Sequence, residues 1–312
     1  MEKILLTGAT GFIGRELLPR LVSEGYEVHT LERYVTGRYS IDCNAAVHYA
    51  NLEDTIATRE AVKNIQPDYV IHLAAISAVS FSYNHYAEVS QANYLGSVNL
   101  AEACLREANL RAFITAGTSE MYGMTLTDRN SHLSEAHPLT PNSPYAVAKA
   151  AFSSYLQYMR MAYQFPFIEM RPFNTYGRKN NTHFFIERTI TQMLSRTEVV
   201  LGDRATIRDW LYVDDHVEGY LKALKSPKAI GEAINLCTGV GYTTEETAGI
   251  IAGMLGFRGR IRWNSSEHRP LDAKILIGAN TKAKRLLGWE PRHSLGDGLA
   301  KAIGYWRGVY GH

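Results

Sequence analysis

A glycine-rich turn near the N-terminus restricts the possible folds of this chain more than any other feature. The apolar run Ile4–Leu6 leads into Thr7-Gly-Ala-Thr-Gly11-Phe-Ile-Gly14, and leucines at helical spacing follow. Three spaced glycines between a strand and a helix form the context that binds a dinucleotide. Gly8 permits the tight turn, Gly11 lets the backbone approach a pyrophosphate, and Gly14 lets the helix pack on the strand. The N-terminus of that helix would then hold the diphosphate.

An acidic residue is predicted at the end of the second strand. The run Glu27–Leu31 delivers Glu32, whose carboxylate can accept hydrogen bonds from the adenosine ribose and would repel a 2′-phosphate. Arg33 and Arg38 follow at once, and arginines are what the 2′-phosphate of NADP would need. We expect NAD, because an acid at the strand end must be neutralised or turned away before a phosphate can bind there. NADP stays the alternative.

Further apolar strands alternate with helical patterns over the first 170 or so residues. Asp68–Ala75 is nearly continuous and apolar, Asn93–Ala108 has helical periodicity, and Ala112–Ala116 and Phe167–Arg171 are further buried strands. Continuous apolar strands are typical of a parallel sheet that is covered on both faces. The alternation predicts an α/β fold, a doubly wound parallel Rossmann sheet. The small residues Ala74 and Ala75 would leave room for a coenzyme at the end of their strand.

After the strand near residue 170 the pattern changes. A helix is predicted near Ile186–Leu194, a strand at Val199–Leu201, a helix at Asp215–Leu224 and a strand at Ala233–Leu236. We find no repeat, low-complexity segment or flexible linker, which favours an elaboration of the sheet over a tethered domain. We expect residues 1–172 to form the dinucleotide-binding domain, rejoined by about 211–238. Residues 173–312 would mostly form a smaller α/β lobe that binds the substrate.

A tyrosine and a lysine stand four residues apart in Ser143-Pro-Tyr145-Ala-Val-Ala-Lys149, which reads as the start of a helix. Residues at this spacing share one helix face. A nearby ammonium group favours the phenolate form of a tyrosine, so Lys149 could make Tyr145 a base near neutral pH. The ordinary alternative is a helix with one aromatic side chain and one solvated lysine, and the spacing alone does not exclude it.

The strand Ala112–Ala116 opens into Gly117-Thr118-Ser119-Glu120-Met-Tyr-Gly123. Polar groups just beyond the carboxyl end of a central strand lie where such sheets bind ligands. The segment is therefore expected to line a ligand site. The ordinary alternative for Glu120 is a carboxylate that caps a local turn.

Together, Thr7-Gly-Ala-Thr-Gly11-Phe-Ile-Gly14, Thr118-Ser-Glu120 and Tyr145-x-x-x-Lys149 resemble the extended short-chain dehydrogenase/reductase family, in particular its sugar-nucleotide epimerases and dehydratases. The resemblance runs from residue 3 to about 307. It is greatest to GDP-mannose 4,6-dehydratases and GDP-4-keto-6-deoxymannose reductases, on Thr118–Gly123, Arg208-Asp-Trp210, His268-Arg-Pro270, Leu276-Ile-Gly278 and Lys282–Trp289. Glu32 departs from NADP-using relatives, which carry a basic or small residue there. Ser119 departs from thymidine-type dehydratases, which carry an aspartate.

The resemblance implies a role for each motif. Thr118, Tyr145 and Lys149 would perform hydride transfer at sugar C4, and Glu120 would be the base of the second step. The residues expected to contact the coenzyme are Gly8, Gly11, Phe12, Ile13, Gly14, Glu32, Arg33, Asn51, Leu52, Leu73, Ala74, Ala75, Tyr145 and Lys149. Asn51 and Leu52 would reach the adenine, although an ordinary loop is an equal alternative there.

The substrate implied by the resemblance is a nucleoside-diphosphate sugar. The residues expected to contact it are Ser119, Asn174, Arg178, Arg208 and Arg269, of which the arginines suit a diphosphate because their planar forks bind it in a bidentate way. A surface ion pair is the alternative for each arginine. The expected activity is 4,6-dehydration of a GDP-mannose-type substrate; the alternatives are a 4-epimerase or a 4-keto-6-deoxy-sugar reductase. A regulatory protein that senses NAD would leave the Thr118–Tyr145–Lys149 triad without a use.

Composition excludes several other classes. The net charge of +2 over 312 residues argues against nucleic acid or a membrane surface as a partner. Cys43, Cys104 and Cys237 are widely spaced, which predicts neither a disulfide framework nor a metal site. The N-terminus lacks a signal-peptide pattern, so we expect a cytoplasmic protein. The resemblance suggests a homodimer or homotetramer through helices near 96–108 and 145–163, with Leu100, Leu105, Tyr155 and Met159 as candidate contacts.

Overall fold

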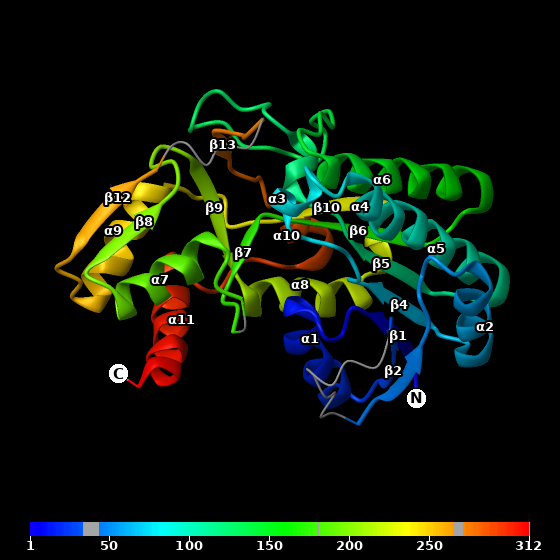
Figure 1. Cartoon of the computed structure of the whole chain (residues 1–312). Coiled ribbons are helices and arrows are strands. Elements are labelled where there is room, and N and C mark those ends of the chain that lie inside the picture. Colours follow the sequence, from blue (N-terminus) through cyan, green and yellow to red (C-terminus); the bar gives the residue numbers. More distant parts are fainter. Residues whose placement is uncertain (34–43, 180, 265–270, 312) are drawn as a thin grey trace.

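A seven-stranded parallel sheet forms the centre of the molecule (Figure 1). The computed structural model describes residues 1–33, 44–179, 181–264 and 271–311. The strand order is β10-β6-β5-β4-β1-β2-β3, so the order reverses beside β1. The strands are β1 (Lys3–Thr7), β2 (Glu27–Glu32), β3 (Ala46–Tyr49), β4 (Tyr69–His72), β5 (Ala112–Ala116), β6 (Phe167–Pro172) and β10 (Glu232–Leu236). Ligands bind such sheets beyond the carboxyl ends of the strands at this reversal.

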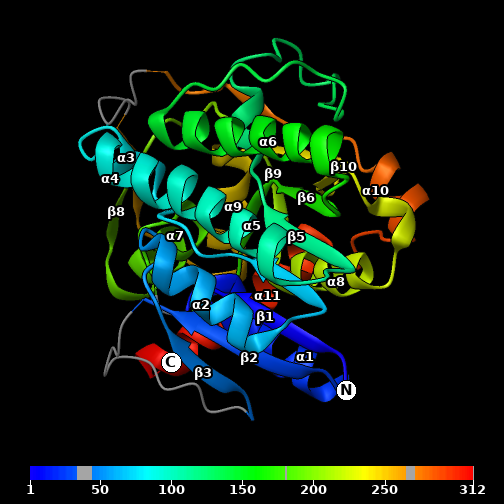
Figure 2. The same cartoon turned by 90° about the vertical axis from the view of Figure 1, so that its right-hand side faces the viewer.

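Helices cover both faces of the sheet, which confirms the predicted doubly wound fold. One face carries α2 (Thr55–Ile65), α5 (Gly96–Glu107) and α6 (Pro144–Tyr163), and the other carries α1 (Phe12–Ser23), α8 (Val213–Leu224) and α10 (Thr281–Leu287) (Figure 2). Successive strand residues point to opposite faces. In β1, Leu5 accordingly packs in the core under α2, α5 and α6, whereas Leu6 packs in the core under α1 and α8.

Smaller sheets and helices form a second group beside the central sheet (Figure 1). The strand β9 (Ile207–Tyr212) pairs with β7 (Asn174–Tyr176), β11 (Gly241–Thr243) and β13 (Ile275–Leu276), and β8 (Glu198–Leu201) pairs with β12 (Arg260–Trp263). The helices α7 (Phe185–Ser195), α9 (Thr244–Leu255) and α11 (Leu295–Tyr310) enclose a core that contains Ile190, Ile251 and Leu299. The remaining short elements are α3 (Val79–Ser82), α4 (Tyr86–Ser90) and the 3-10 turns η2 (Ser119–Tyr122) and η3 (Pro227–Ala229).

Two elements differ from their predicted bounds for reasons that lie in side chains. β4 ends at His72, before Ala75, because the amide of Ala74 donates to the hydroxyl of Thr7 (3.2 Å) and the chain turns there. The helix predicted from Asn93 begins instead with a π-helical turn, η1 (Gln91–Leu95). Within this turn the side chain of Asn93 makes two hydrogen bonds to the backbone of Ile76: Oδ1 accepts from its amide (2.8 Å) and Nδ2 donates to its carbonyl (2.9 Å). Such π-helical turns are frequent at functional sites.

The predicted contact residues of the dimer need a correction. Leu100 and Met159 are fully buried in the core beneath α5 and α6, and Leu105 and Tyr155 are partly buried against the same core. The helical periodicity predicted both helices but not which of their side chains are exposed, because both sides of α6 carry apolar side chains. In the described part of the chain, no helix combines the length and the apolar character needed to cross a membrane.

Candidate active site

The glycine turn between β1 and α1 has the geometry of a pyrophosphate cradle. Gly8 has a φ of +72°, and a Cβ there would stand 2.7 Å from the amide nitrogen of Ala74. A Cβ on Gly14 would stand 2.2 Å from the carbonyl oxygen of Gly8, so only glycine allows this approach. Gly11 is exposed, and α1 begins there without a side-chain cap. The amide groups of the first turn of α1 are thus available to a diphosphate.

The carboxylate of Glu32 lies beside this cradle. Its Oε2 accepts a hydrogen bond from the hydroxyl of Thr10 (2.9 Å), whereas Oε1 is buried and has no partner among the described residues. Burial raises the pKa of Glu32, and hydrogen bonds from Thr10 and from the backbone of Ala9 oppose that rise. A buried acceptor without a partner calls for a ligand donor, and the hydroxyls of an adenosine ribose provide two. The donor set therefore fits NAD. Arg33 is exposed next to it, and Arg38 lies outside the described residues.

A chain of buried hydrogen bonds fixes the opposite wall of the cradle. The hydroxyl of Ser97 donates its single proton to the carbonyl of Asn93 (2.8 Å), so it accepts from Nε2 of His72 (2.8 Å). In the neutral ring the other nitrogen, Nδ1, is then an acceptor, and the hydroxyl of Thr7 donates to it (2.7 Å) while accepting from the amide of Ala74. This direction requires a neutral imidazole, and burial lowers the pKa of His72 to about 3. Sequence reasoning missed His72, although a histidine within an apolar strand is the kind of signal that could have revealed it.

The other residues predicted to contact the coenzyme lie around the same strand ends. Phe12 and Ile13 are half-buried on the first turn of α1, and Leu73 and Ala74 are half-buried beyond β4, where Ala75 is exposed. The carbonyl of Leu52 is held by the side-chain amide of Asn99 (2.9 Å). Asn51 is exposed, and its side chain accepts from the amide of Glu53 (3.2 Å), as expected of a residue that shapes its own loop.

The structure brings Thr118, Tyr145 and Lys149 together at the carboxyl end of β5. Ser143 caps α6 by accepting from the amide of Ala146 (3.1 Å), which places Tyr145 and Lys149 on the first turns of the helix. Tyr145 shares a hydrogen bond with the side chain of Thr118. Lys149 Nζ donates to the carbonyl of Ala116 (2.8 Å). All three side chains are almost completely buried.

The protonation of Tyr145 differs from the sequence prediction. Burial raises the pKa of Tyr145 to about 12, the charge of Glu120 adds to this, and the hydrogen bond from Thr118 opposes it. The ammonium of Lys149 donates to the carbonyl of Ala116 and makes no described hydrogen bond to the phenol. Burial also lowers the pKa of Lys149 to about 8. Without coenzyme, Tyr145 is therefore a protonated phenol at neutral pH.

Glu120 belongs to the same site. It lies on η2, which Thr118 caps by accepting from the amide of Glu120 (3.2 Å). Its side chain is only 9% exposed, and its charge acts on the phenol of Tyr145. Ser119, the preceding residue, is buried as well. A carboxylate thus stands beside the candidate base at the end of the central strand.

The residues predicted to bind substrate have different surroundings. Asn174 begins β7, and its Oδ1 is buried without a partner among the described residues. Arg208, on β9, is nearly buried and donates to Asp272 (3.2 Å). Arg178 stacks on the rings of Phe12 and Phe184 (4.4 and 3.5 Å from the ring centres), so it joins α1 to the β7–α7 connection. Arg269 lies outside the described residues.

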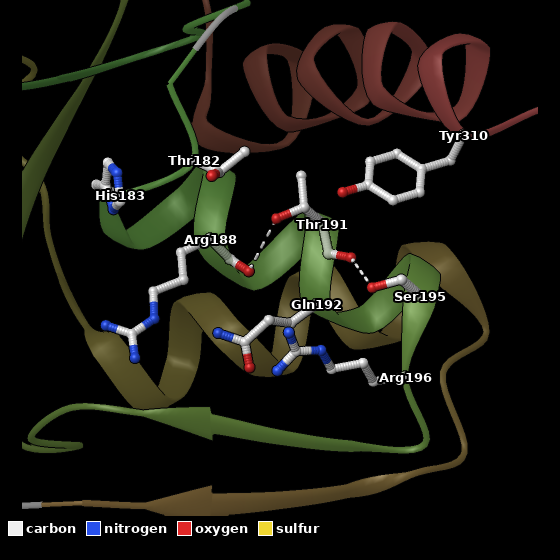
Figure 3. A pocket seen from close by; sticks show the side chains of 8 residues that line it. All are labelled: Thr182, His183, Arg188, Thr191, Gln192, Ser195, Arg196 and Tyr310. Atoms are coloured by element: carbon white, nitrogen blue, oxygen red, sulfur yellow. Dashed lines mark hydrogen bonds between the residues drawn. The ribbon is translucent and has the colours of Figure 1, made fainter.

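Two surface cavities lie apart from these residues. One, of about 350 Å³, lies between α7 and the end of α11, and the polar side chains that line it are shown in Figure 3. The other, of about 580 Å³, is lined by Arg129 and by residues of β11 and α9. Neither is lined by a residue that the sequence predicted for the site. Within the described ranges, no group of three or more histidine, cysteine or acidic side chains could hold a metal.

Comparison with known proteins shows the family to which the chain belongs. The model of the NAD dependent epimerase/dehydratase family matches residues 4–237. The chain is 31% identical to UDP-glucose 4-epimerase of Mycolicibacterium smegmatis, over 98% of each protein. It is 30% identical to GDP-mannose 4,6 dehydratase 2 of Arabidopsis thaliana, over 92% of this chain and 82% of that one. Among solved structures, it resembles Thermus thermophilus UDP-glucose 4-epimerase in complex with NAD, with a TM-score of 0.89, 28% identity and coverage of 98% and 99%.

The family match has a clear structural meaning. It begins in β1 and ends just after β10, so it contains every strand of the central sheet, the glycine turn and all three members of the triad. The chain therefore belongs to the NAD-dependent epimerase/dehydratase family of enzymes that act on nucleotide sugars.

Proposed function

We propose that this enzyme is an NAD-dependent sugar-nucleotide 4,6-dehydratase that acts on a GDP-mannose-type substrate. The observation that carries the proposal is the buried carboxylate of Glu120 beside Tyr145 and Thr118. Oxidation at C4 needs only the tyrosine and its neighbours, whereas water loss across C5 and C6 needs a second proton acceptor. The similarity to GDP-mannose 4,6 dehydratase 2 of Arabidopsis thaliana supports the same choice.

The coenzyme would lie across the carboxyl ends of β1, β2 and β4. In this proposal the amides beyond Gly11 hold the diphosphate, Glu32 holds the adenosine ribose, and the Leu73–Ala75 segment borders the nicotinamide half. When bound, NAD supplies a hydride acceptor and a positive charge near the triad. Residues 1–172, with the return of 211–238 to the sheet, would form this half of the site, and most of 173–312 would bind the sugar nucleotide.

Oxidation at C4 begins with the proton of the sugar O4 hydroxyl. Tyr145 accepts this proton, and Thr118 donates a hydrogen bond that orients the same oxygen. A phenol with a pKa of about 12 is almost entirely protonated at neutral pH, so it cannot accept the proton in that form. Its pKa must therefore fall when ligands bind, and the charged ammonium of Lys149, one helical turn away, contributes to that fall. The C4 hydrogen leaves as hydride, and the carbon becomes a ketone.

The new ketone acidifies the hydrogen on C5. Glu120 accepts this proton, and the C6–oxygen bond then breaks as the hydroxyl leaves with a proton, so that one water is lost. Glu120 can supply that proton itself, with Ser119 beside it to hold a water. Hydride returns to C6 and a proton to C5, which gives a 4-keto-6-deoxy sugar with no net consumption of reductant.

The diphosphate of the substrate would meet fixed cations outside the sheet. Arg208 is our first candidate in the described part of the chain, because it is buried on β9 and donates to Asp272 (3.2 Å), which follows Arg269 by three positions in the sequence. Asn174, with its buried Oδ1, would accept a hydrogen bond from the sugar. Arg178 would act at the same end of the site, held in place by Phe12 and Phe184.

A 4-epimerase is the second candidate, and the similarity to the Mycolicibacterium smegmatis and Thermus thermophilus UDP-glucose 4-epimerases favours it. An epimerase would use Tyr145 and Lys149 for the same oxidation. The 4-ketosugar would then turn over in the site and accept hydride on its other face. Glu120 would have no carbon-bound proton to take, and its burial beside Tyr145 would be structural.

The two candidates predict different products. The purified protein is incubated separately with GDP-mannose and with UDP- and dTDP-hexoses, and product mass is measured without added reductant. A dehydratase gives a product lighter by one water, and we expect this with GDP-mannose. A product of unchanged mass with inverted C4 would identify an epimerase and overturn the proposal. Activity only with a 4-keto sugar and reduced coenzyme would identify a reductase and overturn it as well.

A further inference from the structure

A buried ion pair lies on β6, the strand that pairs with β5 in the central sheet. Glu169 and Arg171 are on β6 and are 2% and 5% exposed. Two nitrogens of the Arg171 guanidinium donate to Oε2 of Glu169, at 2.9 and 3.1 Å. Burial of an ion pair is costly and on average contributes little to stability, so its presence in a central strand calls for another explanation.

The carboxylate of Glu169 contacts α6 one turn beyond Lys149, and it also lies close to the backbone segment to which Lys149 donates. Ser153 lies one turn after Lys149 on α6, and its hydroxyl donates to Oε2 of Glu169 (2.8 Å). Lys149 itself donates to the carbonyl of Ala116 (2.8 Å). A Cβ on the next residue, Gly117, would stand 2.8 Å from Oε1 of Glu169. The carboxylate thus lies against the turn that holds the ammonium of Lys149.

From this geometry we propose that Glu169 is a positioning residue that keeps Lys149 in its charged form, with Arg171 holding the carboxylate in place. The inference rests on the proposed role of Lys149 in the hydride step. It assigns the ion pair an electrostatic function for catalysis in addition to its place in the core. Without a negative charge nearby, burial would drive the lysine towards a neutral amine, which cannot stabilise a phenolate.

The charges around Lys149 support this assignment. The elements packed against the first half of α6 carry these ionisable groups besides Tyr145: His72 on β4, Glu120 and Tyr122 on η2, and Glu169 and Arg171 on β6. The imidazole and the two phenols are neutral at pH 7, because burial moves the pKa of each away from neutrality. Burial lowers the pKa of Lys149 to about 8, and Glu169 is the group that opposes this decrease.

Further contacts prevent the carboxylate from moving to Lys149 and forming a direct ion pair. The guanidinium of Arg171 also donates to the phenol of Tyr122 (3.1 Å), which donates to the side chain of Asn235 on β10 (2.7 Å). Arg171 is therefore anchored across the sheet, and it holds Glu169 in turn. Lys149 then keeps its charge without a direct ion pair, and its ammonium is held by the carbonyl of Ala116.

Two single variants of the full-length protein separate this role from a structural one. Glu169→Gln and Arg171→Met break the same ion pair, but they remove opposite charges. The fraction of neutral Lys149 is followed by its reaction with cyanate as a function of pH, with the modified peptide quantified by mass spectrometry on coenzyme-free protein. We expect Glu169→Gln to lower the apparent pKa of Lys149 by about 1 unit or more, and Arg171→Met to raise it.

A control and a rescue complete the experiment. Glu102→Gln removes a carboxylate that contacts α6 through Tyr155 (2.6 Å), away from Lys149, and should leave the titration unchanged. If either single variant fails to fold, the double variant Glu169→Gln/Arg171→Met removes both charges and should still lower the pKa of Lys149, by less than Glu169→Gln alone. Shifts of the two single variants in the same direction, or an unshifted double variant, would overturn the inference. Because no sugar is used, a failed dehydratase assay cannot be mistaken for either result.

Discussion

Glu32 is the residue on which the choice between the two nicotinamide coenzymes depends. Its buried Oε1 has no partner among the described residues, and a 2′-phosphate would have to approach that same oxygen. We expect the protein to bind NAD at least about tenfold more tightly than NADP, a difference of about 1.4 kcal/mol. Titration of both coenzymes into stripped protein, followed by fluorescence or calorimetry, measures the ratio.

Variants of Glu32 test the cause of that preference. Glu32→Gln removes the charge and keeps the size, so the ratio should fall towards unity through a gain for NADP. Glu60→Gln, on the exposed face of α2, is the matched control and should keep the wild-type ratio. Equal affinities in the wild type, or an unchanged ratio in Glu32→Gln, would contradict the assignment.

For individual residues, the sequence predicted the chemical role of a side chain better than the direction in which the side chain points. Gly8 and Gly14 could be assigned because only glycine tolerates the close approach of backbone that a dinucleotide turn requires. The four-residue spacing of Tyr145 and Lys149 fixed a shared helix face. It could not reveal that the lysine would turn to the carbonyl of Ala116, or that burial would raise the pKa of the phenol, because both depend on the neighbouring strand.

At the scale of elements, two buried histidines join strands and helices and make stability depend on pH. His72 links β1, β4 and α5, and His216 on α8 contacts Thr175 on β7 (2.9 Å). Burial lowers the pKa of each to about 3 from 6.5. Below about pH 6.5 the unfolded chain therefore binds more protons, and stability present above this pH is lost as the pH falls.

The expected loss can be measured by chemical unfolding. Each imidazole should reduce the free energy of unfolding by about 1.4 kcal/mol per pH unit below pH 6.5, or by about 2 kcal/mol at pH 5. The variant His216→Gln should lose about 2 kcal/mol less than wild type between pH 7.5 and 5, and His183→Gln, at an exposed position, controls for the substitution. Identical losses in wild type and His216→Gln would reject the linkage.

The order of elements was predictable, but some of their ends were not. Apolar strands between glycine turns and helical patterns gave β1, β5 and β6 nearly to the residue, because covered parallel strands have few alternatives. The early end of β4 and the π-helical turn before α5 depend on Thr7 and Asn93. These side chains contact backbone about 67 and 17 residues away in sequence, which local periodicity does not report.

At the scale of the whole molecule, the outer face of α6 is the feature that bears on assembly. Tyr158 and Met161 are 45% and 80% exposed there, and exposed apolar side chains on a sheet-covering helix favour contact with a second copy. We expect a dimer, with twice the mass of the 34.9 kDa chain by light scattering at micromolar concentration. The pairing would join α5 and α6 of each copy.

Charge placed on that face should separate the copies. The double variant Tyr158→Glu/Met161→Glu is expected to be monomeric with an unchanged circular dichroism spectrum. Ile56→Glu, at an exposed apolar position on α2, is the control and should remain dimeric. A monomeric wild type would reject the prediction, as would a dimer that survives the double substitution.

Whole-molecule topology was predictable only in part. The sequence pattern predicted a strand at Ala233–Leu236, and this strand pairs with β6 at the edge of the central sheet. Its partner lies about 64 residues earlier, so the sequence predicted that the segment rejoins the sheet but not which strand it pairs with. The pairing of β9 with β7, β11 and β13 could not be foreseen, because these three are two or three residues long and carry no periodic signal.

The central claim is that Glu120 removes the C5 proton, and one substitution tests it most directly. Glu120→Gln keeps the size and most hydrogen bonds of the side chain but cannot accept a proton. Tyr145→Phe is the companion variant, which should lose even C4 oxidation.

Wild type, Glu120→Gln and Tyr145→Phe are incubated with the substrate that wild type converts, and product mass and reduced-coenzyme absorbance are followed together. We predict that Glu120→Gln still forms reduced coenzyme but loses water release by at least about 100-fold. Water release by Glu120→Gln at the wild-type rate would contradict the account.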